Sequence, residues 1–267
     1  GLFGQIEYAK NGFTAFFQGS VSQQQNSRTD VSLYPLGNGK SEKVNNFGYN
    51  TKGGLSYTAG NHTLFGNAGF YSRQPYQNNI FMNYRNDVNQ YAVNEEILGL
   101  ELGYKFASRY VDVAVNAYRT TWANRVTGSS YNASAADVTK FNPTNDPTKL
   151  QLGDIIYNSN YGVKQDHQGL ELEVAARPFQ GFQIKGFASV GDWIYDGSTN
   201  TIIRDQDRNV LGEENRDLTG VKVGDAAQTA YGVGAKYFIV KNLSLDADYR
   251  RYERLYGSLP SSRPTLR

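Results

Sequence analysis

Apolar residues occupy every second position in two consecutive stretches of residues 96–120, which read EILGLELGYKFASRYVDVAVNAYRT. The apolar positions run from Leu98 to Phe106 in the first stretch and from Val111 to Ala117 in the second. Successive side chains of a β-strand point to opposite faces, so this period of two predicts strands with one apolar and one polar face. The short segment ASR between the stretches predicts a tight turn, and hence a β-hairpin.

The same period recurs along the whole chain, and no segment has a convincing helical period of 3.6. We expect about ten strands of ~9–12 residues, at 2–10, 12–22, 47–59, 63–72, 96–106, 111–120, 168–178, 183–195, 229–240 and 243–253. The connections alternate between tight turns and long polar loops, which we place at 23–46, 73–94, 123–165 and 196–226. All tight turns are therefore expected at one end of an antiparallel sheet and all long loops at the other.

Composition excludes several classes of protein. Lys plus Arg total 27 and Asp plus Glu total 25, so the net charge of +2 gives no reason to expect a nucleic-acid partner. The chain has no cysteine, which excludes disulfides and thiolate metal sites. The sequence contains no phosphate-binding loop, no dinucleotide-binding glycine pattern and no nucleophile elbow, so we expect neither an enzyme nor a cofactor.

Three architectures share this alternation. A soluble β-sandwich would bury the apolar face, but its strands average only ~5–6 residues. A propeller would show a recurring signature in each blade, and none is present. A transmembrane β-barrel needs strands of ~9–11 residues, short turns on one side and long loops on the other. It also places aromatic side chains near strand ends, as found beside the tight turns at Tyr8, Tyr104, Phe106, Tyr110, Phe182, Tyr237 and Phe238.

The barrel interpretation assigns a solvent to each face. A mean hydropathy of −0.58 is compatible with it, because only half of each strand would face lipid and the loops are polar. We expect one set of side chains to point outward on a curved sheet, namely Leu98, Leu100, Val113, Val115, Leu170, Leu172, Leu243 and Leu245. The strands at 2–10 and 243–251 would be unpaired edges, so we expect the chain alone not to fold stably in plain buffer.

Several stretches resemble the TonB-dependent outer-membrane receptors, especially those of Bacteroidetes. The first is YSRQPYQNNIFMNYRNDVN followed by NEEILGLELGYKF, in which the matching positions are Asn94, Glu95, Glu101, Leu102, Gly103 and Tyr104. The second is VKQDHQGLELEVAARP, a strand that closes with Arg-Pro before a tight turn. ASVGDWIY, VGDAAQTAYGVGAKY and LSLDADYRRYE are similar to late barrel strands of the same family.

The resemblance implies an all-β fold in which residues 1–267 form a partial antiparallel transmembrane barrel. They would supply about ten consecutive up-and-down strands of a barrel of ~22, without the plug domain, the TonB box or the terminal strands. The implied function is uptake of a scarce, bulky solute (a siderophore, haem, cobalamin or a glycan) across the cell outer membrane. The implied partners are TonB, the solute, outer-membrane lipid and a surface lipoprotein.

Ligand contacts in such receptors come from the outer loops and the upper lumen. The candidates in one loop are Arg73, Tyr76, Phe81, Tyr84 and Arg85, and the candidates where strands emerge are Trp122, Arg125, Trp193 and Tyr195. Aromatic and arginine side chains together suit sugars, siderophores or peptides. The alternative is that loop aromatics pack on neighbouring loops and that both tryptophans belong to the outer aromatic girdle.

The remaining polar residues predict no chemistry. Glu101, Glu171 and Glu173 are expected to pair with plug arginines or with Lys105 and Lys185 rather than to act as an acid–base pair. The segment DQDRNVLGEENR, from Asp205, begins like a calcium-binding loop but lacks the required glycine and the closing glutamate, so no metal site is predicted. Two functional alternatives stay open: a self-contained porin-like barrel and a soluble β-rich binding module.

Overall fold

The computed structural model describes residues 1–30, 39–81 and 86–257, and it consists almost entirely of antiparallel strands. The strands are β1 (Leu2–Lys10), β2 (Phe13–Asn26), β3 (Val44–Ala59), β4 (His62–Arg73), β5 (Glu95–Ala107), β6 (Val111–Asn132), β7 (Ile155–Ala176), β8 (Phe182–Tyr195), β9 (Ser198–Arg204), β10 (Val210–Asp217), β11 (Ala227–Val240) and β12 (Leu243–Leu255). The helices are α1 (Gln77–Ile80) and α2 (Ala135–Phe141). Neither helix in this part of the chain has the length and apolar character needed to cross a bilayer.

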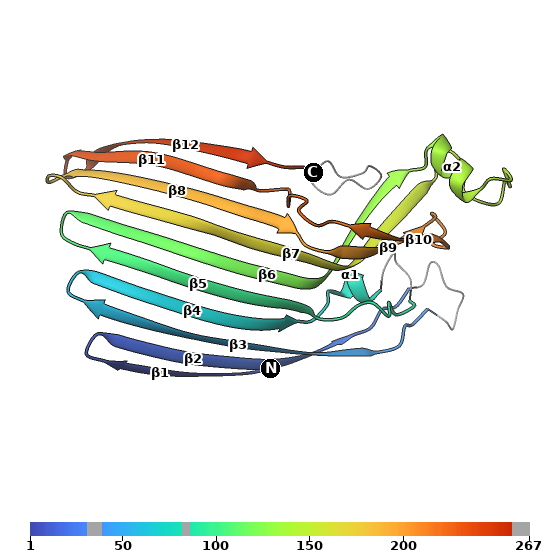
Figure 1. The fold of residues 1–267 in the computed structure, drawn as a ribbon, viewed down its shortest axis with the longest axis horizontal. Helices are drawn as coiled ribbons and strands as arrows, with labels where there is room; N and C mark the ends of the chain where they lie inside the picture. The colour runs from blue at the N-terminus through green and yellow to red at the C-terminus, as the bar shows by residue number, and fades with distance from the viewer. Residues whose placement is uncertain (31–38, 82–85, 258–267) are drawn as a thin grey trace.

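The main sheet runs in chain order, β1 to β8 and then β11 and β12, and every neighbouring pair is antiparallel. The expectation of about ten up-and-down strands is therefore confirmed. The tight turns all lie at one end of the sheet and the long connections at the other, as the loop lengths predicted (Figure 1). Within the described residues β1 and β12 do not pair with each other, so the sheet is open and has two free edges.

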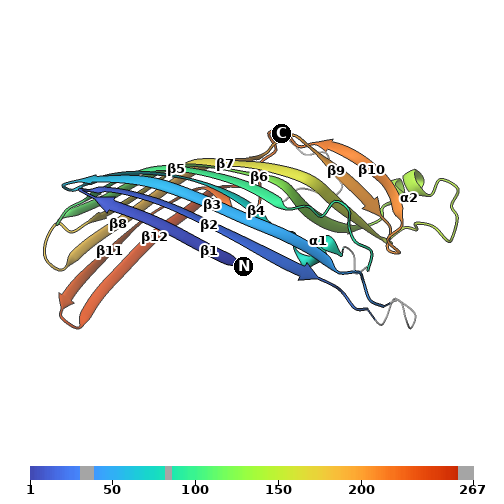
Figure 2. The same cartoon turned by 90° about the horizontal axis from the view of Figure 1, so that it is seen from below.

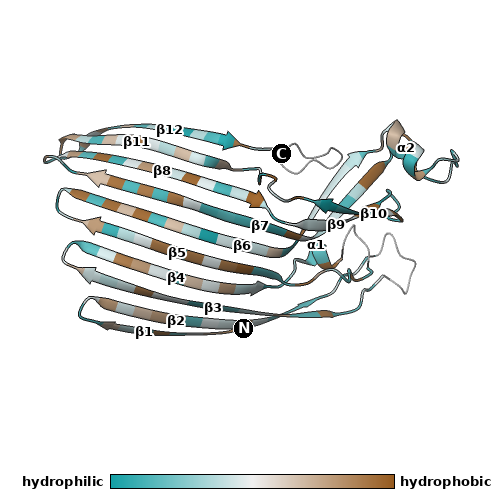
Figure 3. Ribbon diagram, viewed as in Figure 1, coloured by the Kyte–Doolittle hydropathy of each residue, from teal (hydrophilic) through white to brown (hydrophobic). Residues whose placement is uncertain are grey.

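The two faces of the sheet differ as the alternation predicted. The apolar face carries leucines and valines such as Leu55, Leu100, Val115 and Leu172, and the polar face carries residues such as Lys52, Asn67, Glu101, Asn116 and Glu171. Hydrophobic and hydrophilic residues alternate visibly along the strands (Figure 3). Seven of the eight predicted outward side chains are exposed, while Val113 is half-buried, and no second sheet covers them in the described structure.

The sheet is strongly curved along its width (Figure 2). Single hollows on the polar face are lined by as many as six neighbouring strands, which requires the polar face to be the concave one. Aromatic rings on this face lie across glycines. A Cβ built on Gly103 would approach the Phe65 ring to 2.2 Å, and one on Gly54 would approach the Phe16 ring to 2.5 Å. These rings cover the bare backbone of the glycines and leave no room for a side chain there.

We expect Gly103→Ala to lower the free energy of unfolding by about 1–2 kcal/mol, because the new methyl group displaces the Phe65 ring. Gly99→Ala is the matched control on the same strand and face, since its Cβ would meet only Thr120 Oγ1 at 4.0 Å. Urea unfolding of the reconstituted full-length protein measures both variants. Equal stability of the two variants would contradict the ring-over-glycine packing.

Beyond the main sheet, the long connections form an ordered projection, called the arm here (residues 125–165 and 198–217; Figure 1). The outer parts of β6 and β7 continue as a ribbon, β9 pairs with β7, and β10 pairs with β9. Its buried cluster consists of Ala133, Leu150, Ile156 and Ile203. The predicted loops at 123–165 and 196–226 are thus wrong over much of their length, because these polar strands pair through their backbones and show little apolar alternation.

The arm contains two carboxylates whose ionised forms are stabilised by folding. Burial pushes the pKa of Asp137 upward, but hydrogen bonds from the Ser134 hydroxyl and amide and from the Tyr131 hydroxyl outweigh it and leave this pKa below its usual value. A hydrogen bond from Lys140 lowers the pKa of Glu214. Both carboxylates therefore stabilise the arm at pH values above the ordinary carboxyl pKa. This contribution is lost as the pH falls through the lowered pKa values of the two groups in the folded arm.

We expect hydrogen exchange in α2 and β10, corrected for intrinsic rates, to accelerate as pH falls below about 4, the ordinary carboxyl pKa. The double variant Asp137→Asn, Glu214→Gln should lose this pH step because it has no carboxylate to protonate at either position. Protection that stays constant between pH 7 and pH 3 in the unsubstituted protein would contradict the assignment.

Candidate functional site

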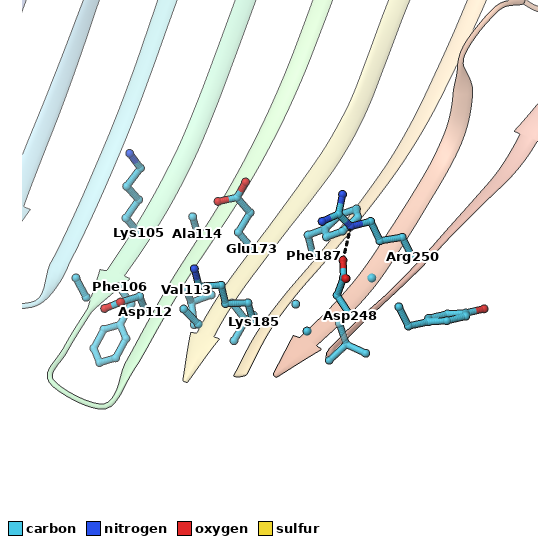
Figure 4. Close-up of a pocket in the computed structure, with 18 residues that line it drawn as sticks. Lys105, Phe106, Asp112, Val113, Ala114, Glu173, Lys185, Phe187, Asp248 and Arg250 are labelled. Atoms are coloured by element: carbon cyan, nitrogen blue, oxygen red, sulfur yellow. Dashed lines mark ion pairs between the residues drawn. The ribbon is translucent and has the colours of Figure 1, made fainter. Parts of the chain in front are cut away.

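Among the hollows of the described structure, the turn-end hollow and the central hollow lie on the polar face. The turn-end hollow has a volume of about 590 Å³ and lies near the tight turns, between β5 and β12 (Figure 4). It is lined by charges of both signs, in which Asp112 pairs with Arg177 at 2.7 Å and Asp248 with Arg250 at 2.9 Å. The central hollow has a volume of about 520 Å³ and is lined by residues from β3 to β8. Both volumes fall in the range of small-molecule sites.

The carboxylates on this face are not paired as the sequence suggested. Glu101 accepts hydrogen bonds from Asn67 Nδ2 at 2.7 Å and from Asn116 Nδ2 at 2.8 Å. Glu171 and Glu173 form no ion pair with Lys105 or Lys185 in the described structure. The lysine alternative is therefore wrong, because adjacent strands place each carboxylate opposite an amide, a small residue or a ring instead, and pairing with plug arginines stays a prediction.

Four predicted candidates meet at the loop end of the polar face, in what we call the rim cluster (Arg73, Tyr76, Trp122 and Arg125, with Glu95). Arg73 Nη2 lies 2.6 Å from Glu95 Oε2, and Arg73 Nη1 donates to the Tyr76 hydroxyl at 2.9 Å. The guanidinium groups of Arg73 and Arg125 lie 5.9 and 5.1 Å from the Trp122 ring. Glu95 is 5% exposed and lies 3.9 Å from Arg125.

A β-bulge brings Arg125 into this cluster. Strict alternation would place residue 125 on the opposite face from Trp122. The register with β7 shifts between Trp122 and Arg125, and Asn124 between them has a φ of 59°. The extra residue turns Arg125 back onto the polar face, where it meets Trp122, Glu95 and Gln165. The two guanidinium groups thus share one carboxylate and enclose one indole ring.

A second group of rings lies on the same face, beside the central hollow. Trp193 stacks on His167 with ring centroids 5.3 Å apart, and its Nε1 donates to the Tyr118 hydroxyl at 2.9 Å. Gln228 fixes the backbone of Trp193 by accepting from its amide and donating to its carbonyl. Trp122 and Trp193 both line the central hollow, so neither belongs to a girdle on the apolar face.

Two further candidates are buried in the described structure. Phe81 is 3% exposed, and Tyr195 is 7% exposed in a cluster with Val163, Leu218 and Val221. Both were expected on accessible surfaces, but Leu218 and Val221 of the segment before β11 pack on Tyr195. Tyr84 and Arg85 lie outside the described residues.

Sequence reasoning missed four residues of these groups: Glu95, Gln165, Tyr118 and His167. Glu95 faces Arg73 directly in the β4–β5 register, but only the pairing reveals this.

In the calcium-loop-like segment, Asp205 accepts hydrogen bonds from the amide and side chain of Asn209 and thereby closes the β9–β10 turn. The described residues contain no group of three metal-ligating side chains.

Comparison with known proteins adds no assignment: the sequence matches no protein-family model, and no curated protein matches it significantly.

Proposed function

We propose that this chain contributes strands to a transmembrane β-barrel of the bacterial outer membrane, and that the barrel takes up a bulky solute. One observation carries the proposal: within the described residues, a single curved sheet has a hollowed polar face and an apolar face that no second layer covers. A soluble sheet of this size would bury its apolar face against a second layer. Lipid is the solvent that makes such exposure favourable.

The dimensions of the apolar face fit a bilayer. On β5 its apolar positions run from Leu98 to Phe106, and Glu96 follows toward the loops. The eight steps between these nine residues, at ~3.4 Å each and tilted by ~40°, reach about 21 Å, close to the ~25 Å apolar band of outer-membrane barrels. The ion pairs Arg119–Asp166 and Arg251–Glu253 lie on the same face, toward the loop end.

The turn end carries the aromatic residues expected where a bilayer meets water. The rings of Phe179, Phe182 and Tyr237 contact one another with centroids 5.0–6.4 Å apart. His62 shares a hydrogen bond of 2.7 Å with the Tyr104 hydroxyl. Amphipathic rings favour the headgroup region, because one part of each ring system is apolar and the other is polar.

Uptake is supported by the position of the rim cluster and the central hollow on the face that would line the lumen. The resemblance adds a plug, energy coupling through TonB and a surface lipoprotein as partners. The solutes it implies are siderophores, haem, cobalamin and glycans. Both free edges, β1 and β12, would have to be paired inside the bilayer, because unpaired backbone groups are costly in hydrocarbon.

Membrane fractionation of the full-length protein tests the proposal. We expect it in the outer-membrane fraction, extracted only by detergent, and we expect a deletion strain to lose growth on one class of scarce nutrient. The isolated chain should aggregate in plain buffer, because its apolar face and both edges are exposed. A monomer that melts cooperatively without detergent would instead support a soluble binding module.

A further inference from the structure

Three aromatic rings beside the central hollow each lie against a glycine of the sheet. A Cβ built on Gly69 would lie 2.8 Å from ring atoms of Tyr71. A Cβ built on Gly169 would lie 2.6 Å from the Tyr118 hydroxyl. A Cβ built on Gly191 would lie 2.6 Å from Nε1 of Trp193. The tip or edge of each ring therefore lies against bare backbone, and the rest of each ring is partly accessible. The three rings come from β4, β6 and β8, and all three line the central hollow.

Hydrogen bonds hold this platform in place. Trp193 Nε1 donates to the Tyr118 hydroxyl, and the His167 ring stacks on Trp193 with centroids 5.3 Å apart. None of these rings is fully buried. A rigid, half-exposed aromatic surface favours a flat ligand with C–H bonds on its face, because those hydrogens are attracted by the negative face of the ring.

Acceptor groups surround the platform. Glu101 is fixed by Asn67 and Asn116, and Glu171, which pairs with Asn116 in the β6–β7 register, forms no hydrogen bond or ion pair in the described structure. The Asn116 Oδ1 atom is buried without a partner. Carboxylate and amide oxygens are the acceptors that ligand hydroxyl groups require.

The charge of the hollow disfavours an anionic ligand. Two carboxylates face one ammonium group, that of Lys52, which lies 6.0 Å from the Phe16 ring. The nearest arginines, Arg73 and Arg125, are already engaged with Glu95. The net negative charge disfavours ferric chelates, haem carboxylates and phosphates.

We propose that the central hollow binds a neutral oligosaccharide, with sugar rings packed against Tyr71, Tyr118 and Trp193 and with hydroxyl groups donating to Glu171. The proposal rests on the function proposed above, since it names the class of solute.

Isothermal titration of the detergent-solubilised full-length protein tests it. The probes are four neutral hexaoses (α-1,4-glucan, β-1,4-glucan, β-1,4-xylan and α-1,6-mannan) and two anionic chelates (haemin and ferric citrate). We expect at least one hexaose to bind and neither chelate to compete. Trp193→Ala should weaken that binding about tenfold or more, and Glu171→Gln by a smaller factor.

Phe187→Ala is the matched control. Phe187 lies on the same strand, its ring crosses Gly232 in the same way, and it lines the turn-end hollow instead. It should leave hexaose affinity unchanged, and Trp193→Phe should retain part of it. Failure of all four hexaoses to bind, binding unaffected by Trp193→Ala, or equal losses in Trp193→Ala and Phe187→Ala would each overturn the assignment.

The outcome is separable from the proposed function. A protein that resides in the outer membrane and takes up a ferric chelate would refute the saccharide site and leave the transporter intact. A protein found only in the soluble fraction would refute the transporter, whatever it binds.

Discussion

Leu172→Lys is expected to lower the free energy of unfolding in lipid vesicles by about 2–4 kcal/mol, the cost of a cation near the middle of a lipid-facing strand. Leu172 is 40% exposed on the apolar face of β7, between Leu170 and Val174. At an exposed site in water the same change would shift stability by no more than about 0.5 kcal/mol. The size of the effect therefore reports which solvent covers the apolar face.

Glu173→Lys is the control at the neighbouring residue, which faces the opposite side of the sheet and lines the turn-end hollow. We expect this variant to unfold within about 1 kcal/mol of the unsubstituted protein, because a solvated face accommodates a charge. Urea titration of the reconstituted protein, together with its abundance in the outer membrane, measures both variants. Equal behaviour of the two substitutions would remove the argument for a lipid-facing surface.

Glu95→Gln should destabilise the loop end of the sheet by about 2–3 kcal/mol. The change preserves the shape of the side chain but removes the carboxylate shared by Arg73 and Arg125, and a charge that loses its partner in a buried setting is costly. Both guanidinium groups keep partial contact with water, since their side chains are 35% and 31% exposed, so we place the cost below that of a fully buried pair.

Glu96→Gln provides the comparison one residue along β5. Glu96 is exposed and forms no ion pair in the described structure, so this variant should change stability by less than about 0.5 kcal/mol. Hydrogen exchange should locate the effect of Glu95→Gln at the start of β5 and in α1, and Trp122 should become more accessible to a quencher. Identical unfolding of the two variants would mean that the rim cluster contributes nothing to stability.

The candidate site was only partly predictable from the sequence. Arg73, Tyr76, Trp122 and Arg125 were selected for their chemistry, and the structure brings them together around Glu95. Phe81 and Tyr195 were selected on the same grounds but are buried. Residue type indicates what a side chain can bind, whereas burial depends on loop segments that are distant in sequence.

What the sequence determined by itself is the strand pattern: ten strands in order, the two faces, and the separation of tight turns from long loops. These features follow from alternation, which is local, because each residue's face depends only on its position along its own strand. The period of two thus predicted both the apolar face and the polar face before any pairing was known.

Only the tertiary structure decided which side chains meet. The bulge between Trp122 and Arg125 reverses the face of one arginine, and the β4–β5 register sets Glu95 opposite Arg73. The hairpin of β9 and β10 forms by backbone pairing with β7, without an apolar signal of its own. Register, bulges and ring-over-glycine contacts depend on the partner strand, so no single stretch of sequence encodes them.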